Sequence, residues 1–243
     1  MRLIAWNANG VHHKKRSFEQ NAKFLWKQHA DLIIISETIG PDEPMKPGIG
    51  WTESKDHGLG LGVAVGDGLT LRAEETIKST VLATAFQITA GSITLYLLAV
   101  WPVKDKGDSS YGKQLCSLLE DKAVKMFLGH KYAILAGDFN STAKIKAQAK
   151  LHHKLVAQAK DLGLKSVFHE KKQANHGEEE EEDHTYRHGG RGKGHFHIDY
   201  CFLSTALLGE ASFTILNGPK WEEHSDHFPI QVDFTVPGLS SGK

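Results

Sequence analysis

The chain has 243 residues, of which 40% are hydrophobic and 24% charged, values that fit one compact domain able to fold without cross-links. The 29 basic and 29 acidic residues balance, which neither indicates nor excludes a nucleic acid partner, because only the distribution of charge decides that. Cys116 and Cys201 form no CxxC spacing, so neither a disulfide framework nor a thiolate zinc site is expected. This cysteine usage fits a protein of a reducing compartment.

Short β-rich runs bounded by glycine, proline and aspartate recur along the chain, as strands should. In chain order they cover residues 2–6, 31–36, 62–65, 84–90, 92–101, 132–137, 197–204 and 229–236. Helical patterns cover residues 17–30, 112–128 and 143–163, with Ser17 as an N-cap and Gly163 as a C-cap. The arrangement predicts an α/β protein with two packed mixed sheets and helices outside them.

No linker or internal repeat interrupts the pattern, so residues 1–243 are predicted to form a single domain. One stretch is unusual, "HGEEEEEDHTYRHGGRGKGH", in which the acidic run Glu178 to Asp183 precedes a glycine-rich basic arm. We expect residues 174–195 to form a mobile, solvated loop. No apolar run is long enough to cross a bilayer, and no charged-then-apolar leader follows Met1. We therefore expect a soluble cytoplasmic or otherwise intracellular protein without a membrane partner.

Polar side chains stand at or near one end of five sequence-distant strand regions. They are Asn7, Glu37, Asp138, Asn140, Asp199, Asp226 and His227. Asp and Asn often begin turns, and for Asp138 alone a turn role is the simpler interpretation. A turn role fits Asp199 poorly, because an alternating strand puts this residue on one face with His197 and Cys201. If that face points into a core, a lone carboxylate there would be very costly. A histidine is its natural partner, so we expect Asp199 to hold His227.

The segments "WNANG", "ISET", "GDFN", "HIDYCFLS" and "SDHFPI" follow one another in this order. In this order and spacing they resemble the motifs of the endonuclease/exonuclease/phosphatase superfamily, which includes exonuclease III, apurinic endonucleases, DNase I, sphingomyelinases and inositol polyphosphate 5-phosphatases. The resemblance runs from Trp6 to about Ile230. It implies a DNase I-like four-layer α/β sandwich, in which helices flank two packed mixed β-sheets and the site lies in the cleft at the sheet ends. It also implies metal-dependent hydrolysis of a phosphate ester.

The resemblance assigns a metal ion to part of this set. Glu37 would be the principal ligand of Mg²⁺, with Mn²⁺ as a substitute, and Asp226 and the amide oxygen of Asn7 would contribute directly or through water. Oxygen ligands of this kind suit a hard cation that keeps several of its waters. Asn7 has an alternative role as the cap of the bend after the first strand.

The resemblance assigns the chemistry to the other residues. Asp138 would orient and deprotonate the attacking water, and Asn140 would fix that geometry or donate to the phosphate. His227, held by Asp199 and protonated by that pairing, would donate to the scissile phosphate.

One position of the family does not transfer. Relatives carry a Tyr or His on the phosphate, a little before a proline in a middle strand, whereas this segment reads "LLAVWPVKD". Trp101 stands nearby, but its indole has one donor and no acid–base capacity, so a core or rim role is the simpler interpretation. Either Lys104 or a histidine from a loop serves in place of the missing Tyr or His, or the chemistry is slower than in the relatives.

Three basic segments lie near the predicted site residues in the sequence. A loop after Asn7 is basic, eight lysines lie between residues 144 and 172, and a glycine-rich arm spans residues 186–197. The candidate phosphate-binding residues in the loop and the arm are Arg16, Arg187, Arg191 and Lys193. Tyr186 or Phe196 could stack on a base. A solvated surface explains such lysines and loops nearly as well.

Histidines are numerous, and two adjacent pairs occur, at residues 12–13 and 152–153. Neither pair accompanies thiolates or an HExxH pattern, so zinc is not expected. The leading hypothesis is a monomeric Mg²⁺-dependent DNA nuclease, either endonuclease or exonuclease. The alternatives are a phosphoesterase of the same scaffold acting on a phosphoinositide, a sphingolipid or a small ester, and a nucleic-acid-binding pseudoenzyme.

Overall fold

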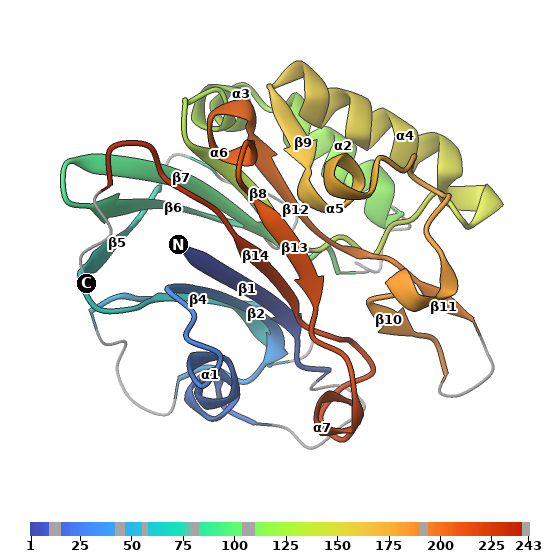
Figure 1. Cartoon of the computed structure of the whole chain (residues 1–243), viewed down its shortest axis with the longest axis horizontal. Helices are drawn as coiled ribbons and strands as arrows, with labels where there is room; N and C mark the ends of the chain where they lie inside the picture. The colour runs from blue at the N-terminus through green and yellow to red at the C-terminus, as the bar shows by residue number, and fades with distance from the viewer. Residues whose placement is uncertain are drawn as a thin grey trace.

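The computed structural model describes residues 1–9, 16–41, 47–54, 58–75, 77, 83–103, 110–189 and 194–239. Within these ranges the strands form two six-stranded mixed sheets and one short two-stranded sheet. Figure 1 shows the two large sheets packed against each other, with helices on the outer side of each. The four-layer α/β sandwich that the sequence predicts is therefore confirmed.

The first sheet has the strand order β13-β14-β1-β2-β4-β3. In that order the strands are Ser212–Ile215, Ile230–Asp233, Arg2–Asn7, Leu32–Thr38, Gly60–Val65 and Ile49–Glu53. Only β1 and β2 pair in parallel. The helices α1 (Phe18–Trp26) and α7 (Pro219–Glu222) cover its outer face, where Phe18 and Trp221 share a buried cluster with Trp6 of β1.

The second sheet has the strand order β5-β6-β7-β8-β12-β9. In that order the strands are Leu69–Ala73, Ala83–Ala90, Ile93–Val100, Ala133–Asp138, Asp199–Ser204 and Leu164–Ser166. β7 and β8 are parallel, which requires the crossover through α2 and α3. The helices on this side are α2 (Tyr111–Glu120), α3 (Lys122–Leu128), α4 (Lys146–Asp161), α5 (Val167–Lys172) and α6 (Thr205–Leu208).

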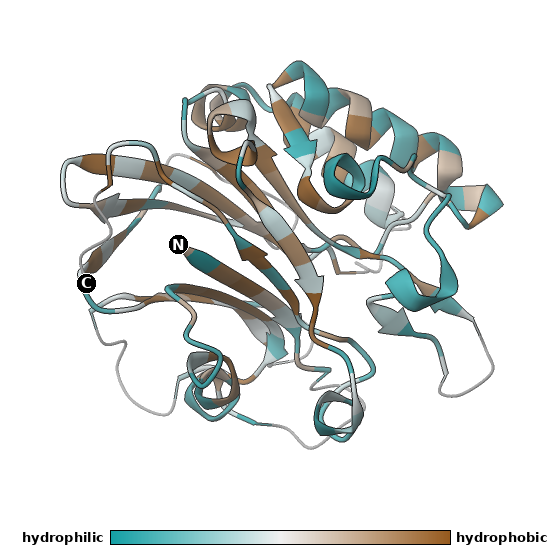
Figure 2. Cartoon of the chain, viewed as in Figure 1, coloured by the Kyte–Doolittle hydropathy of each residue, from teal (hydrophilic) through white to brown (hydrophobic). Residues whose placement is uncertain are grey.

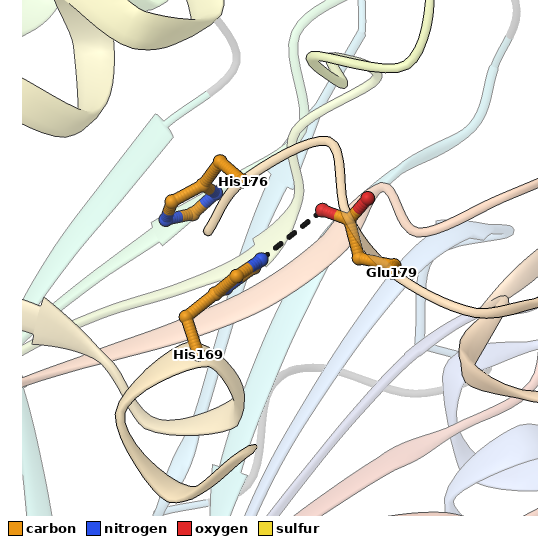
Figure 3. A group of neighbouring side chains, drawn as sticks. All are labelled: His169, His176 and Glu179. Atoms are coloured by element: carbon orange, nitrogen blue, oxygen red, sulfur yellow. Dashed lines mark hydrogen bonds and ion pairs between the residues drawn. The ribbon is translucent and has the colours of Figure 1, made fainter. Parts of the chain in front are cut away.

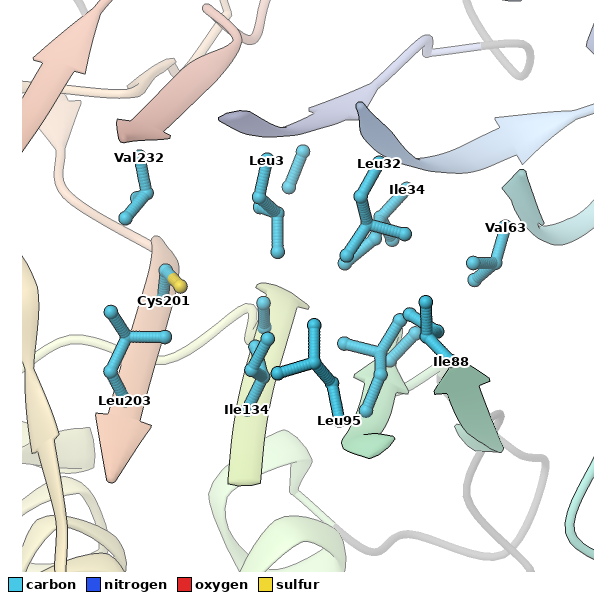
Figure 4. Close-up of a cluster of buried hydrophobic side chains, with 14 of the residues drawn as sticks. Leu3, Leu32, Ile34, Val63, Ile88, Leu95, Ile134, Cys201, Leu203 and Val232 are labelled. Carbon is cyan, nitrogen blue, oxygen red and sulfur yellow. The ribbon is translucent and has the colours of Figure 1, made fainter. Parts of the chain in front are cut away.

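The main core lies between the two sheets. Leu3 and Leu32 of the first sheet face Ile88, Leu95 and Ile134 of the second in this cluster (Figure 4). All five side chains are fully buried, and each such burial contributes roughly 1.5–3 kcal/mol. Figure 2 shows the hydrophobic residues concentrated along the strands, whereas α4 alternates hydrophobic and hydrophilic positions.

The predicted helices are present, with one correction. Ser17 caps α1 in a capping box with Gln20, and Gly163 follows α4 at φ 76, so both predicted ends are confirmed. The pattern over residues 112–128 is wrong as a single helix. Asp121 adopts an extended conformation at φ −60 and ψ 135, and its carboxylate accepts the N–H groups of Ala123 and Val124 to begin α3. A bilayer crossing needs about 20 apolar residues, and no helix in the described ranges meets that requirement.

Candidate active site

The ends of β1 and β8 meet, although these strands belong to different sheets. Asn7, the last residue of β1, donates through Nδ2 to Oδ2 of Asp138, the last residue of β8, at 2.9 Å. The same Nδ2 lies 3.0 Å from Glu37 Oε1 of β2. Asp199 begins β12 and lies opposite Asp138 in the antiparallel β8–β12 register. Four of the polar residues that the sequence singled out are therefore neighbours.

Asp199 and His227 form a buried pair. His227 Nδ1 lies 3.0 Å from Asp199 Oδ2, and the two side chains are 6% and 2% exposed, respectively. The hydroxyl of Thr185 accepts the backbone N–H of Asp199, and Ser225 Oγ accepts that of His227. The backbone of both partners is thus anchored, and the contact expected from the sequence is present.

The Asp199–His227 pair sets the charge of the imidazole. Burial alone would lower the pKa of His227, but the charge of Asp199 and its hydrogen bond, with Asp138 and Asp226 nearby, raise it to about 10. The ring is therefore protonated at neutral pH. Because Nδ1 faces Asp199, the proton on Nε2 is the one available to an anionic ligand.

Asp138 is held by amide groups on both sides. Besides the contact with Asn7, its Oδ1 accepts the N–H of Asn140 at 2.8 Å, and its Oδ2 accepts Nδ2 of Asn140 at 3.0 Å. Burial and the charge of Asp199 raise the pKa of Asp138 to about 7, although His227, Asn7 and Asn140 act in the opposite direction. A carboxylate with a pKa near neutrality has the properties of a general base.

Two half-buried carboxylates border this group. Glu37 stands at φ 53, where the β2–β4 register shifts, and Asp226 Oδ1 accepts Nδ2 of Asn9 at 2.6 Å. Glu37 contacts Asn7 and Asp226 contacts Asn9, so both carboxylates lie against the end of β1 and the residues that follow it. Among the described residues, the second oxygen of each makes no hydrogen bond. Such oxygens fit a hard divalent cation.

Other atoms of the site could also contribute to metal binding. Asp138, Asp199 and His227 offer ligand atoms that lie within 4.8 Å of one another, but hydrogen bonds inside the protein already engage all three side chains. The amide oxygen of Asn7 accepts the N–H of Asn9 at 2.8 Å. Asn7 therefore serves the local backbone and bridges two carboxylates through its nitrogen.

Two tyrosines complete the site. Burial raises the pKa of Tyr111, and Asp138 and Glu37 raise it further. Burial likewise raises the pKa of Tyr186, to about 12, and its ring lies 4.6 Å from that of His227, centroid to centroid. The sequence analysis missed Tyr111, because a tyrosine at the start of a helix carries no periodic signal.

A pocket of about 390 Å³ opens beside these residues. It is lined by Tyr111, Asn140, Ile145, Gln148, Tyr186, His188, Phe196 and Ile198. Tyr186 and Phe196 belong to the hairpin of β10 (Tyr186–Arg187) and β11 (His195–Phe196), which a backbone bridge from Tyr186 to His227 holds against the site. Aromatic walls of this kind accept a planar base or a sugar ring.

Three of the predicted substrate-binding residues have partners within the protein. Trp101 is buried in the core between the sheets, which confirms its core interpretation. Arg187 contacts Glu222 at 3.0 Å and donates to the Ser225 carbonyl, and Arg16 Nη2 lies 2.9 Å from His224 Nδ1. These contacts give Arg187 and Trp101 structural roles. Lys104, Arg191 and Lys193 lie outside the described residues.

The acidic run includes a short 3-10 helix, η1 (Glu181–Asp183). Glu179 and Asp183 are buried, and Asp183 pairs with Lys172 at 2.9 Å. The prediction of a wholly solvated segment is therefore wrong for these two residues, because their carboxylates have partners inside the fold.

No protein-family model matches the sequence, and no curated protein matches it. Three solved structures share the architecture over 97% of this chain. The endonuclease domain of TRAS1, a telomere-specific non-LTR retrotransposon, is 17% identical over 99% of its own length, with a TM-score of 0.65. An AP endonuclease from Archaeoglobus fulgidus is 16% identical over 100% of its length, with a TM-score of 0.66. The 3′ phosphatase NExo from Neisseria, bound to a product DNA hairpin, is 16% identical over 99% of its length, with a TM-score of 0.63.

These similarities define the class of fold. The chain therefore has a DNase I-like four-layer α/β fold, as the sequence motifs predict.

Proposed function

We propose that this protein is a metal-dependent phosphodiesterase that hydrolyses the backbone of DNA. The observation that carries the proposal is the buried group in which Asn140 and Asn7 hold Asp138 while Asp199 holds His227. A base with a raised pKa and a protonated imidazole stand together at the meeting point of the two sheets, which is the combination that phosphoryl transfer to water needs.

Asp138 takes the proton of the attacking water. Its pKa of about 7 lets it accept a proton near neutral pH, and the amides of Asn7 and Asn140 fix the direction of its oxygens. The water oxygen then forms a bond to phosphorus, and the bond from phosphorus to the leaving oxygen breaks.

His227 stabilises the phosphate as this charge develops. Its Nε2–H donates to a non-bridging oxygen, while the contact between Nδ1 and Asp199 keeps the ring protonated and correctly oriented. Tyr111 is a second donor, because burial, together with the neighbouring Asp138 and Glu37, raises its pKa and keeps its phenol neutral. We propose that Tyr111 fills the role for which the family uses the Tyr or His that is absent beside Trp101.

Glu37 and Asp226 would hold Mg²⁺ or Mn²⁺ through the oxygens that are not hydrogen-bonded to the described residues. A bound divalent cation supplies charge neutralisation at the phosphoryl and leaving oxygens. Asn7 links this pair to the base, since its one amide nitrogen contacts both Glu37 and Asp138.

Two features support DNA as the substrate. The aromatic pocket beside Asn140 is large enough for a nucleotide ring. Helix α4 begins eight residues after Asp138 and carries exposed lysines, which suit a phosphate backbone. NExo, which has this fold, is bound to product DNA.

A pseudoenzyme is not favoured, because the base, the imidazole pair and the acidic residues are all retained.

The decisive experiment offers several substrates to the purified protein. Supercoiled plasmid, abasic duplex, single-stranded DNA, RNA and a chromogenic phosphodiester are incubated with and without Mg²⁺ or Mn²⁺. We expect metal-dependent DNA cleavage that EDTA abolishes, and a loss of about 10³-fold or more in Asp138→Asn and His227→Ala. His130→Gln, which removes an exposed histidine stacked on Tyr96, is the control.

Each alternative has its own outcome. DNA cleavage by Asp138→Asn at the wild-type rate would show that Asp138 is not the base and would contradict the proposed mechanism. Cleavage of the chromogenic ester alone, insensitive to salt, would replace the nuclease with a small-ester phosphoesterase, because only a polyanion releases many counterions on binding.

A further inference from the structure

A second cluster of ionisable side chains lies outside the candidate active site. Figure 3 shows His169 of α5 together with His176 and Glu179 of the segment that follows. One nitrogen of each imidazole and one carboxylate oxygen all lie within 4.8 Å of one another. These three residues form a histidine–glutamate cluster, and none of them belongs to the proposed phosphodiesterase machinery.

Both imidazoles of the cluster have hydrogen-bond partners. His169 Nε2 lies 3.1 Å from Glu179 Oε1, and its Nδ1 lies 2.9 Å from Ser166 Oγ. His176 Nδ1 lies 3.0 Å from His152 Nε2. Partners on the far nitrogen of an imidazole are what orients a histidine that ligates a metal ion.

The cluster also contains a buried carboxylate oxygen without a hydrogen-bond partner among the described residues. Glu179 has a side chain that is 1% exposed, and its Oε2 is buried without a hydrogen-bond partner among the described residues. Nε2 of the neighbouring buried His197 is likewise without a partner in that part of the chain. A buried carboxylate oxygen without a donor is costly, and a bound cation would satisfy it.

We propose that His169, His176 and Glu179 bind a Zn²⁺ ion. Two imidazoles and one carboxylate form a common ligand set for zinc, whereas Mg²⁺ prefers oxygen ligands alone. A tetrahedral zinc holds its ligand atoms roughly 3.4 Å apart, so ligand atoms that now lie within 4.8 Å of one another must move closer together. The ion takes the place of the direct contact between His169 Nε2 and Glu179 Oε1.

One side chain must rotate for the site to form. The rings of His169 and His176 are stacked, with centroids 3.5 Å apart and planes 20° from parallel, so their lone pairs do not yet converge. His176 is half-buried in a connecting segment and is one of the residues that line the neighbouring cavity. A cavity of about 770 Å³, lined in part by His169 and His176, leaves space for a water as fourth ligand.

The role of such an ion is structural. It ties α5 to the segment leading towards Thr185, whose hydroxyl accepts the N–H of Asp199. Bound zinc would thus stabilise the segment that anchors Asp199, and through it the Asp199–His227 pair, without contacting the substrate.

The test measures metal binding directly. The full chain is stripped of metal, dialysed against Zn²⁺ in excess Mg²⁺, and analysed for zinc content, and Co²⁺ absorption reports the ligand geometry. We expect one tightly held zinc per chain, with a dissociation constant in the micromolar range or below, and a higher melting temperature on binding. His176→Gln and Glu179→Gln should each weaken binding at least tenfold.

Two controls separate this site from others. His153→Gln removes an exposed histidine that lines the same cavity and should leave zinc binding unchanged. Glu37→Gln removes a proposed active-site ligand and should also leave it unchanged. The proposal is overturned if the chain holds no zinc at micromolar concentrations, or if folded His176→Gln, verified by circular dichroism, binds zinc as the parent does.

Discussion

Asp138 and Asp199 lie opposite each other across the antiparallel strands β8 and β12, so two buried carboxylates occupy facing positions of one sheet. Like charges this close disfavour double ionisation. The protonated ring of His227 and the amides of Asn7 and Asn140 offset that repulsion. The site therefore holds a defined set of protons, which substitutions should change in predictable directions.

Asp199→Asn removes the charge that raises the pKa of His227 most. The alkaline limb of the pH–rate profile should move down from about 10 towards the ordinary histidine value, since the imidazolium is no longer stabilised. Measurement of kcat/KM against pH, with NMR titration of the His227 ring, checks this. An alkaline limb that stays where it is would show that His227 does not act as the cation.

Asn7→Ala removes a hydrogen bond that lowers the pKa of Asp138. The acidic limb of the same profile should then shift upward from about 7, because the carboxylate loses a donor that favours its charged form. Asn175→Ala, which removes a surface contact with Glu178, is the matched control. An acidic limb identical in both variants would contradict the role assigned to Asn7.

Tyr111→Phe tests the proposed second donor to the phosphate. We expect kcat/KM to fall about 10- to 100-fold with the fold intact, since one hydrogen bond to a charged phosphate contributes roughly 1.5–3 kcal/mol. Tyr132→Phe serves as the control, because its hydroxyl contacts only the carbonyl of Pro237 among the described residues. Equal activity of the two variants would show that Tyr111 does not donate to the phosphate.

The stability of the protein should fall as pH rises above 6.5. His227 has a folded-state pKa of about 10 and an unfolded value near 6.5. Its contribution is therefore fully present below pH 6.5 and is lost as pH rises towards 10. Thermal melts should show this decline in the parent chain and a flatter profile in His227→Gln. Parallel profiles would mean that the pair does not stabilise the fold.

Ser17→Ala should destabilise the fold by about 1 kcal/mol, because Ser17 caps α1 in a capping box. Ser110→Ala removes a longer, exposed cap contact of α2, 3.4 Å from Lys113 N, and should cost less. Urea denaturation of both variants gives the comparison. A smaller loss for Ser17→Ala than for Ser110→Ala would contradict the assignment of the cap.

The sequence predicted the elements with strong patterns and missed the weak ones. Buried runs such as residues 132–137 became central strands because apolar side chains fill both faces. The strands β3, β5 and β13 were missed, because they are short edge or near-edge strands with half-buried, mixed side chains. Their pairing depends on neighbouring strands that local sequence does not reveal.

The same distinction holds for the sites. Asp199 and His227 could be paired from sequence because an acid on a buried strand face requires a partner. Tyr111 joins the site only through the position of α2, and the cluster of His169, His176 and Glu179 depends on the path of the chain after α5. The histidine pair at 152–153 carried no useful signal, since it contributes only His152, as a neighbour of His176.

The pairing of β1 with β14 has a consequence for synthesis. Arg2 lies opposite Asp233, 231 positions later in the chain. At about 5–20 residues per second a ribosome needs on the order of 10 to 50 s to cover that interval. During nearly all of this interval, one edge of β1 lacks its partner β14, and His227 has not yet been synthesised. A nascent chain of this architecture therefore lacks the Asp199–His227 pair, and during those seconds its open edge is a target for chaperones.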